Sequence, residues 1–203
     1  MKNRLLLLLP MLAVAMYSCK KEESLEPEID GGKIAGTYDF VGIEAKTEAD
    51  QTIIFDAENT ARSITVSHYF SKNNGGTYTF GADKFVATDI TYAVDTLMYN
   101  RTYWNGELDF EESAPFSFTL PPTSNSATYR LAGTDSIYLT GSPVNVPGSP
   151  PAPTGPMGNR YSWAGDTLVI KFEFDNTVSS NEDGIRSTMV QKAYVTTKLK
   201  KRL

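Results

Sequence analysis

Apolar and polar residues alternate along much of this chain between Ile34 and Leu199. The longest alternating run is 86–98, where every second residue belongs to a mostly apolar set and residues between them are small or acidic. The runs 116–120 and 168–174 alternate in the same way. A period of two with one apolar side is typical of a half-buried β-strand, so we expect three strands here. We expect the prolines at 121–122 to end the second of them, because proline cannot donate to a sheet ladder.

Turn-forming residues separate the expected strands. The dipeptide at 105–106, Asn-Gly, tolerates positive φ at both positions and predicts a type I′ hairpin, and residues 71–76 predict a second hairpin connection. Segments 129–139 and 161–170 both contain a strand pattern, an Ala-Gly turn, an aspartate beside Ser or Thr, and a second strand pattern. The sequence has no amphipathic helix pattern long enough to connect parallel strands. We therefore expect an all-β fold built as an antiparallel meander.

The first residues differ from the rest of the chain. Lys2 and Arg4 precede the apolar residues 5–9 and 11–16, and polar residues return at Lys20. This order is typical of a secretory signal, and its apolar part is too short to span a bilayer stably. We therefore expect residues 1–18 to be a signal peptide.

Cys19 follows the small residue Ser18 at the end of this signal, and the arrangement resembles the lipobox of bacterial lipoproteins. The resemblance implies cleavage before Cys19, a lipid on its thiol and acylation of the new amino group, which together exceed what stable attachment needs. Residues 20–23, Lys-Lys-Glu-Glu, resemble the export tag of Bacteroidota surface lipoproteins, with a solvated tether as the alternative. The implied location is the outer membrane, on either face. The alternative is an ordinary signal peptide followed by a chance cysteine.

Two further segments lack strand patterns. Residues 19–33 contain five acidic residues, Pro27 and two glycines, which predicts a tether that leads to one domain at 34–203. Residues 141–159 contain six prolines and four glycines. We expect a surface loop there, and a lid or contact loop at one end of the domain is the alternative.

Charge and residue types exclude several classes of function. The formal charge is −5, and removal of residues 1–18 takes away two cations and no acid, which leaves −7. Nucleic-acid binding depends on Lys and Arg, so it is not expected. After lipidation of Cys19, the only cysteine, no thiol remains for a disulfide, a nucleophile or a metal. His68 is the only histidine, and no Gly-x-Ser-x-Gly motif accompanies it, so we expect a packed or surface histidine. We expect no enzyme, no metal site and no cofactor.

Aromatic residues are concentrated in the expected strands, and most of them are expected to form the core. A roughly eight-stranded barrel can also hold one small ligand. On this hypothesis the candidate cavity residues are the following aromatic side chains: Tyr38, Phe40, Tyr92, Trp104, Phe118, Trp163 and Phe172.

The lipobox, the acidic tether, the opening Ile34-Ala-Gly-Thr-Tyr38 and the run of hairpins together resemble the lipocalin-like lipoproteins of Bacteroidota. Gly36-Thr37-Tyr38 is similar to the Gly-x-Trp opening of lipocalins, with Tyr38 in place of tryptophan. The resemblance implies that the meander closes into a lipocalin-like barrel, and a two-sheet sandwich is the alternative. The expected function is non-enzymatic binding of a small apolar ligand by a lipid-anchored barrel. The alternative is a solid lipoprotein that contacts a protein or glycan partner through loops such as 141–159.

Overall fold

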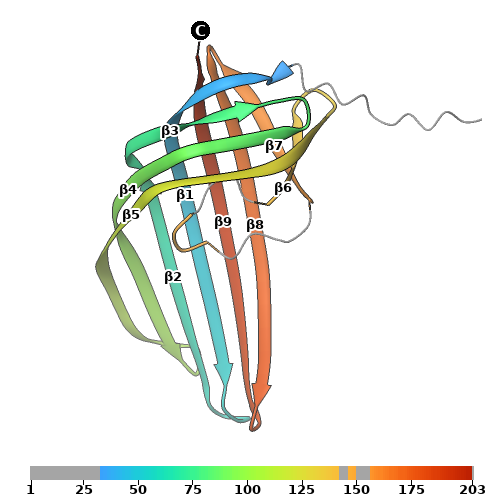
Figure 1. Ribbon diagram of the computed structural model, residues 1–203. Coiled ribbons are helices and arrows are strands. Elements are labelled where there is room, and N and C mark those ends of the chain that lie inside the picture. Colours follow the sequence, from blue (N-terminus) through green and yellow to red (C-terminus); the bar gives the residue numbers. More distant parts are fainter. Residues whose placement is uncertain (1–32, 142–145, 150–155, 203) are drawn as a thin grey trace, which may run out of the picture.

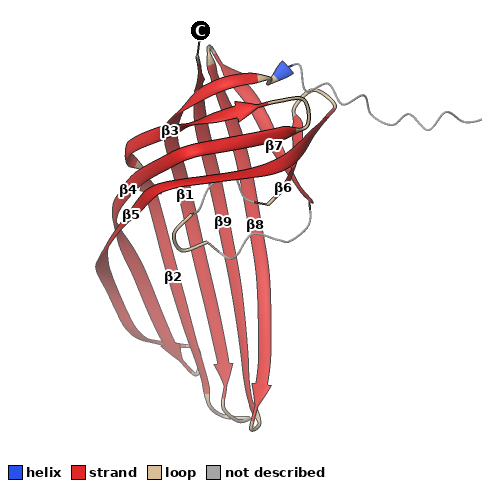
Figure 2. Cartoon of the chain, in the orientation of Figure 1, coloured by secondary structure: helices blue, strands red, loops and turns tan. Residues whose placement is uncertain are grey.

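The computed structural model describes residues 33–141, 146–149 and 156–202. Residues 1–32, which include the expected signal peptide and most of the tether, lie outside the described part. Apart from one helical turn at its start, the described chain consists of β-strands and connecting turns (Figure 2). Within these residues no helix has the length and the apolar character that a membrane crossing requires.

Nine strands follow one another in the described residues. Their bounds are β1 (Gly36–Ile54), β2 (Thr60–Phe70), β3 (Lys72–Phe80), β4 (Lys84–Trp104), β5 (Glu107–Ala132), β6 (Ser136–Thr140), β7 (Pro156–Ala164), β8 (Thr167–Glu182) and β9 (Ile185–Lys201).

The strands form one antiparallel sheet that closes on itself (Figure 1). β2 and β3 act as one long strand between β1 and β4, because β1 pairs with β3 over Gly36–Asp39 and with β2 over Glu44–Ile54. The order then follows the chain from β4 to β9, and β9 pairs with β1 along most of its length. The predicted all-β antiparallel meander with a barrel-like closure is therefore confirmed, and the described residues form one sheet instead of the two of a sandwich.

The ring is closed only in its upper half. β5 pairs with β6 over Tyr129–Ala132 alone, and β7 pairs with β8 over Thr167–Lys171 alone on the β8 side. Below these pairings β5, β4, β2, β1, β9 and β8 continue as an open sheet that extends beyond the barrel (Figure 1). We call this part the extension.

The expected end of a strand at 121–122 is wrong, because β5 continues through both prolines. Opposite them the register of β4 with β5 shifts, with Ile90 facing Thr123 and Tyr92 facing Leu120. The two prolines therefore lie in a bulge, where no ladder N–H is required of them. β5 also has no described strand partner on its other side at this point, so its edge tolerates proline.

The barrel and the extension meet at a bend in β1 and in the β2–β3 strand. The register of β1 shifts at Gly42, opposite Ser71, the residue that separates β2 from β3. The N–H of Ser71 donates to the carbonyl of Ile43 at 2.9 Å, and the Ser71 hydroxyl accepts from the N–H of Ile43 at 2.8 Å. The Asn74 amide donates to the Val41 carbonyl at 2.6 Å. These bonds satisfy the backbone groups that the bend removes from the ladder.

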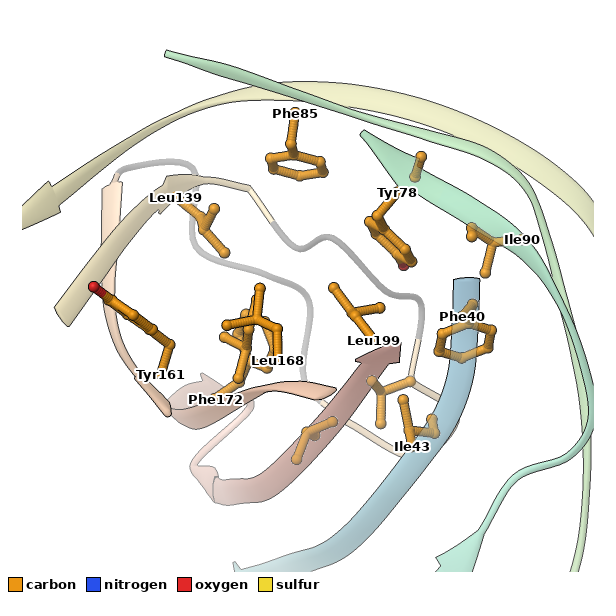
Figure 3. Close-up of a cluster of buried hydrophobic side chains, with 14 of the residues drawn as sticks. Phe40, Ile43, Tyr78, Phe85, Ile90, Leu139, Tyr161, Leu168, Phe172 and Leu199 are labelled. Carbon is orange, nitrogen blue, oxygen red and sulfur yellow. The ribbon is translucent and has the colours of Figure 1, made fainter. Parts of the chain in front are cut away.

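The core fills the upper half. Side chains from all sides of the ring point inward, among them Tyr78, Phe85, Leu139, Phe172 and Leu199 (Figure 3). Two ring pairs touch edge to face, Tyr38 with Phe80 at 5.7 Å between centroids and Phe80 with Tyr129 at 5.4 Å. Two tyrosine hydroxyls that enter the core have carbonyl partners, since Tyr38 donates to Ile34 at 2.7 Å and Tyr129 donates to Gly81 at 2.6 Å. Apolar burial of this kind is the main stabilising contribution to the fold.

We predict that Gly42→Ala destabilises the fold by about 2 kcal/mol. Gly42 has φ +146°, and a Cβ there would lie 2.7 Å from Asn74 Nδ2 and 2.8 Å from Ser71 Oγ, so the bonds at the bend would be displaced. Gly106→Ala is the control, because Gly106 has φ +86° and no atom within 4 Å of an added Cβ. Urea unfolding should give a smaller loss for the control, and equal losses would show that the contacts at the bend contribute nothing.

We predict that stability falls above pH 10. Burial raises the pKa of Tyr38 to about 12, and it also raises the pKa values of Tyr69, Tyr78, Tyr92 and Tyr129. An unfolded tyrosine has a pKa near 10, so the folded state holds these protons more tightly. Their stabilising contribution is complete below pH 10 and is lost as pH rises through the raised values. Phenolate absorbance and circular dichroism should change together, and full ionisation of these tyrosines in a folded protein would contradict the prediction.

Candidate binding site

The seven aromatic residues predicted to line a cavity do not share one environment. Tyr38, Phe40, Tyr92 and Phe172 are buried in the barrel core. Phe118 is partly buried and packs 6.1 Å from the ring of Tyr92. These five side chains are therefore brought together around one interior.

The two tryptophans lie elsewhere. Trp163 is 41% exposed at the upper end of the barrel, with its ring 6.2 Å from that of Tyr38. Trp104 is 46% exposed at the tip of the extension, where it contacts Phe55 at 5.8 Å. The structure thus places Trp104 away from the barrel interior. The cavity that these residues were predicted to line stays a prediction.

The surface loop expected at 141–159 is wrong in two places, because residues 156–159 belong to β7 and residues 146–149 pack against the barrel. Val146 is 5% exposed and belongs to the core. The Tyr69 hydroxyl donates to the Pro147 carbonyl at 2.7 Å, and Gly148 lies against Thr47, with 3.4 Å from its Cβ position to the threonine hydroxyl. Residues 146–149 therefore cover the lower end of the barrel interior. Residues 142–145 and 150–155 lie outside the described part.

We predict that Tyr69→Phe detaches this cover. Loss of the hydrogen bond to Pro147 should lower the free energy of unfolding by about 1 kcal/mol and expose residues 146–149 to proteolysis. Tyr129→Phe is the matched control, since it removes a similar bond to Gly81 at the other end of the barrel. Equal cleavage of both variants within 146–149 would contradict the prediction.

A hollow lies on the outer face of the extension, opposite to the side that continues the barrel interior. Ala45 and Val195 point into the barrel, so their neighbours Lys46 and Tyr194 lie on the outer face. The hollow has a volume of about 730 Å³ and receives side chains from four strands, β1, β2, β4 and β9. Its lining includes Lys46, Glu48, Val66, His68, Leu97, Tyr99, Lys192 and Tyr194.

The floor and the sides of the hollow are apolar and exposed. Val66 is 36% exposed, Leu97 45%, Tyr99 50% and Tyr194 51%. Val66 faces Tyr99 across the β2–β4 pair, and Tyr194 faces Lys46 across the β1–β9 pair. Four large apolar side chains on one exposed hollow are unusual for a face that only meets water. A volume of this size is that of a small-molecule site.

The charged groups of the hollow are of both signs. Lys46 and Lys192 lie on neighbouring strands, and neither forms an ion pair with a carboxylate of the described chain. Glu48 faces Lys192 in the β1–β9 register. Below the hollow, the hydrogen bond from Arg62 lowers the pKa of Asp50, and the charge of Lys192 adds to this to a smaller extent. Two ammonium groups are therefore available beside an apolar floor.

His68 lies at the edge of this hollow as a surface histidine. Its Nε2 is 2.9 Å from Glu44 Oε1, and its ring is 5.2 Å from that of Phe70. Its side chain is 48% exposed. Across the described ranges, no three His, Cys, Asp or Glu side chains come together as a metal ion would need.

Comparison with known proteins adds no function to this geometry. A scan against protein-family models and searches of curated proteins and of solved structures found no match.

The sequence contains one signal for the hollow on β4. The expected single face over 86–98 is wrong at its start, because the bulge between Ala87 and Ile90 leaves Ala87 buried and Val86 exposed. From Thr91 to Asp95 the outward positions are small or polar, but the next two outward positions are Leu97 and Tyr99. This change on the water-facing side marks where the barrel exterior becomes the hollow. Tyr194, between the inward Ala193 and Val195, repeats the same signal on β9.

Proposed function

We propose that this chain is a lipid-anchored, non-enzymatic binding protein whose ligand is a small amphipathic molecule with an anionic group. The anchor is the acylated Cys19, in the outer membrane of a Gram-negative bacterium, and the sequence around it supports this assignment. The binding site is the hollow of the extension, and its exposed apolar floor beside two unpaired lysines is the observation that carries the proposal.

The chemistry of the ligand follows from the lining. An apolar body rests on Val66, Leu97 and Tyr99, where burial of apolar surface supplies most of the binding free energy. An anionic group meets Lys46 and Lys192, which fix its orientation. Glu48 and the polar edge at His68 disfavour a ligand with several negative charges.

The barrel interior is a second candidate site for the small apolar ligand. Asn159 and Thr197 are 5% and 1% exposed, and their side-chain oxygens have no hydrogen-bond partner in the described chain. Their strand neighbours Ile137 and Ile170 are core residues, so both lie on the inward side. Buried oxygens of this kind are satisfied by a bound water or by a ligand.

Binding is tested with 1-anilinonaphthalene-8-sulfonate, a fluorescent amphipathic anion, and the folded protein. Lys46→Glu with Lys192→Glu should weaken binding about tenfold or more, because two attractive charges become repulsive. Lys33→Glu with Lys201→Glu, the same charge change at the upper end of the barrel, is the control and should leave affinity unchanged. Equal loss in both variants would reject the hollow as the site.

The two candidate sites are separated by one further pair of variants. Leu97→Ser should reduce the affinity for the probe if the hollow binds it, and Thr197→Val should leave affinity unchanged. The opposite result would assign the ligand to the barrel interior. Unaltered binding in all of these variants would remove both sites.

Anchoring is tested separately by intact mass measurement of the protein from native membranes. The expected mass is that of residues 19–203 with attached acyl chains, and Cys19→Ser should release the protein into the soluble fraction. An unmodified thiol on a soluble protein would overturn the anchor and leave the binding result standing.

A further inference from the structure

The upper end of the barrel carries a group of exposed cations. The described chain begins and ends there, and the N–H of Arg202 donates to the Thr37 carbonyl at 2.9 Å (Figure 1). We call the following four residues the basic end: Lys33, Lys200, Lys201 and Arg202.

Only two cations of the basic end are neutralised by acids. Lys200 Nζ lies 3.6 Å from Asp166, and Arg202 lies 2.6 Å from Asp39. Lys33 and Lys201 form no ion pair with another described residue. Two unpaired positive charges therefore lie at the end of the barrel where the described chain begins and ends.

An exposed tryptophan accompanies these charges. Lys201 pairs with Tyr38 in the β1–β9 register, and Trp163 contacts the same tyrosine. Trp163 is 41% exposed although its neighbours form the core. Tryptophan and lysine side by side are typical of surfaces that meet lipid headgroups, where the indole and the ammonium group both find partners.

The opposite end of the molecule has the reverse charge. The tip of the extension carries more exposed acids than cations. Arg101 pairs with Glu111, and Arg186 follows the β8–β9 turn, but the remaining exposed acids are Glu107, Asp109, Glu112, Glu182 and Asp183. An anionic surface would therefore attract one end of this protein and repel the other.

We propose that the basic end rests on the anionic headgroups of the bilayer in which Cys19 is anchored, so that the extension and its hollow point away from the membrane. The inference rests on the proposed acylation of Cys19. Residues 20–32 connect Cys19 to Lys33, and even a fully extended chain of this length reaches only about 50 Å. The anchor therefore keeps the basic end near the bilayer, where each lysine adds to the attraction.

The charge contribution is tested without the acyl chains, on residues 19–203 carrying Cys19→Ser. Vesicles of phosphatidylcholine with phosphatidylglycerol should bind this protein in sedimentation assays, and vesicles of phosphatidylcholine alone should not. Lys33→Glu with Lys201→Glu should weaken the binding about tenfold or more, and added salt should do the same. Lys46→Glu with Lys192→Glu is the matched control and should retain binding.

The orientation is tested with the two tryptophans of the chain. In Trp104→Phe, the fluorescence of Trp163 should shift to shorter wavelength when anionic vesicles are added. In Trp163→Phe, the fluorescence of Trp104 should not shift, because it lies at the distal tip. Circular dichroism confirms that each variant is folded.

Each outcome supports or overturns the proposal. A shift of Trp104 alone would reverse the orientation, and equal binding to both kinds of vesicle would remove the role of charge. No binding to either would overturn the headgroup contact even if native mass measurement shows the acylated cysteine. An unmodified Cys19 together with strong anionic binding would instead remove the anchor and leave the surface assigned.

Discussion

The bend at Gly42 is the constraint on which the rest of the structure depends. There the register of β1 shifts, and Ser71 and Asn74 bind the backbone groups that leave the ladder. Above the bend the strands curve around a filled core. Below it the same strands run on as an open sheet. Without a local device of this kind, strands of up to 26 residues would continue one curvature along their whole length.

This division separates the stabilising core from the proposed binding surface. The barrel concentrates buried aromatic rings, and residues 146–149 close its lower end with Val146 in the core. Because the barrel core supplies most of the buried apolar surface, the extension can expose apolar side chains on its outer face and the fold stays stable. Soluble proteins rarely expose large apolar side chains side by side, as Leu97, Tyr99 and Tyr194 are exposed here. Their exposure supports the proposed contact surface.

Charge is distributed along the length of the molecule and not spread evenly. Cations gather where the chain enters and leaves the barrel, and acids gather at the tip of the extension. The formal charge of −5 does not reveal this polarity, because a net charge says nothing about where the charges lie. A membrane anchor at the basic end and a ligand site on the extension would use this arrangement together, with the site held toward the surrounding water.

Local pattern predicted most of the strands and the antiparallel order, since alternation and turn chemistry act between neighbouring residues. The hairpin connection expected at 71–76 is wrong, because β2 and β3 continue as one strand between β1 and β4. The strand end expected at the prolines 121–122 is also wrong, because the pairing of β4 with β5 creates a bulge that accommodates them. The aromatic residues indicated a core, but the sequence did not show where along each strand the core ends. Trp104 lies in the extension because β4 is long enough to continue beyond the barrel. The hollow could not be predicted as a site, since its lysines and tyrosines lie on strands whose register only the closed sheet defines. The sequence by itself thus determined the all-β class and the antiparallel order, and which end resembles a lipid anchor. The tertiary structure alone decided which outward residues meet, because that depends on pairing between segments more than 100 residues apart.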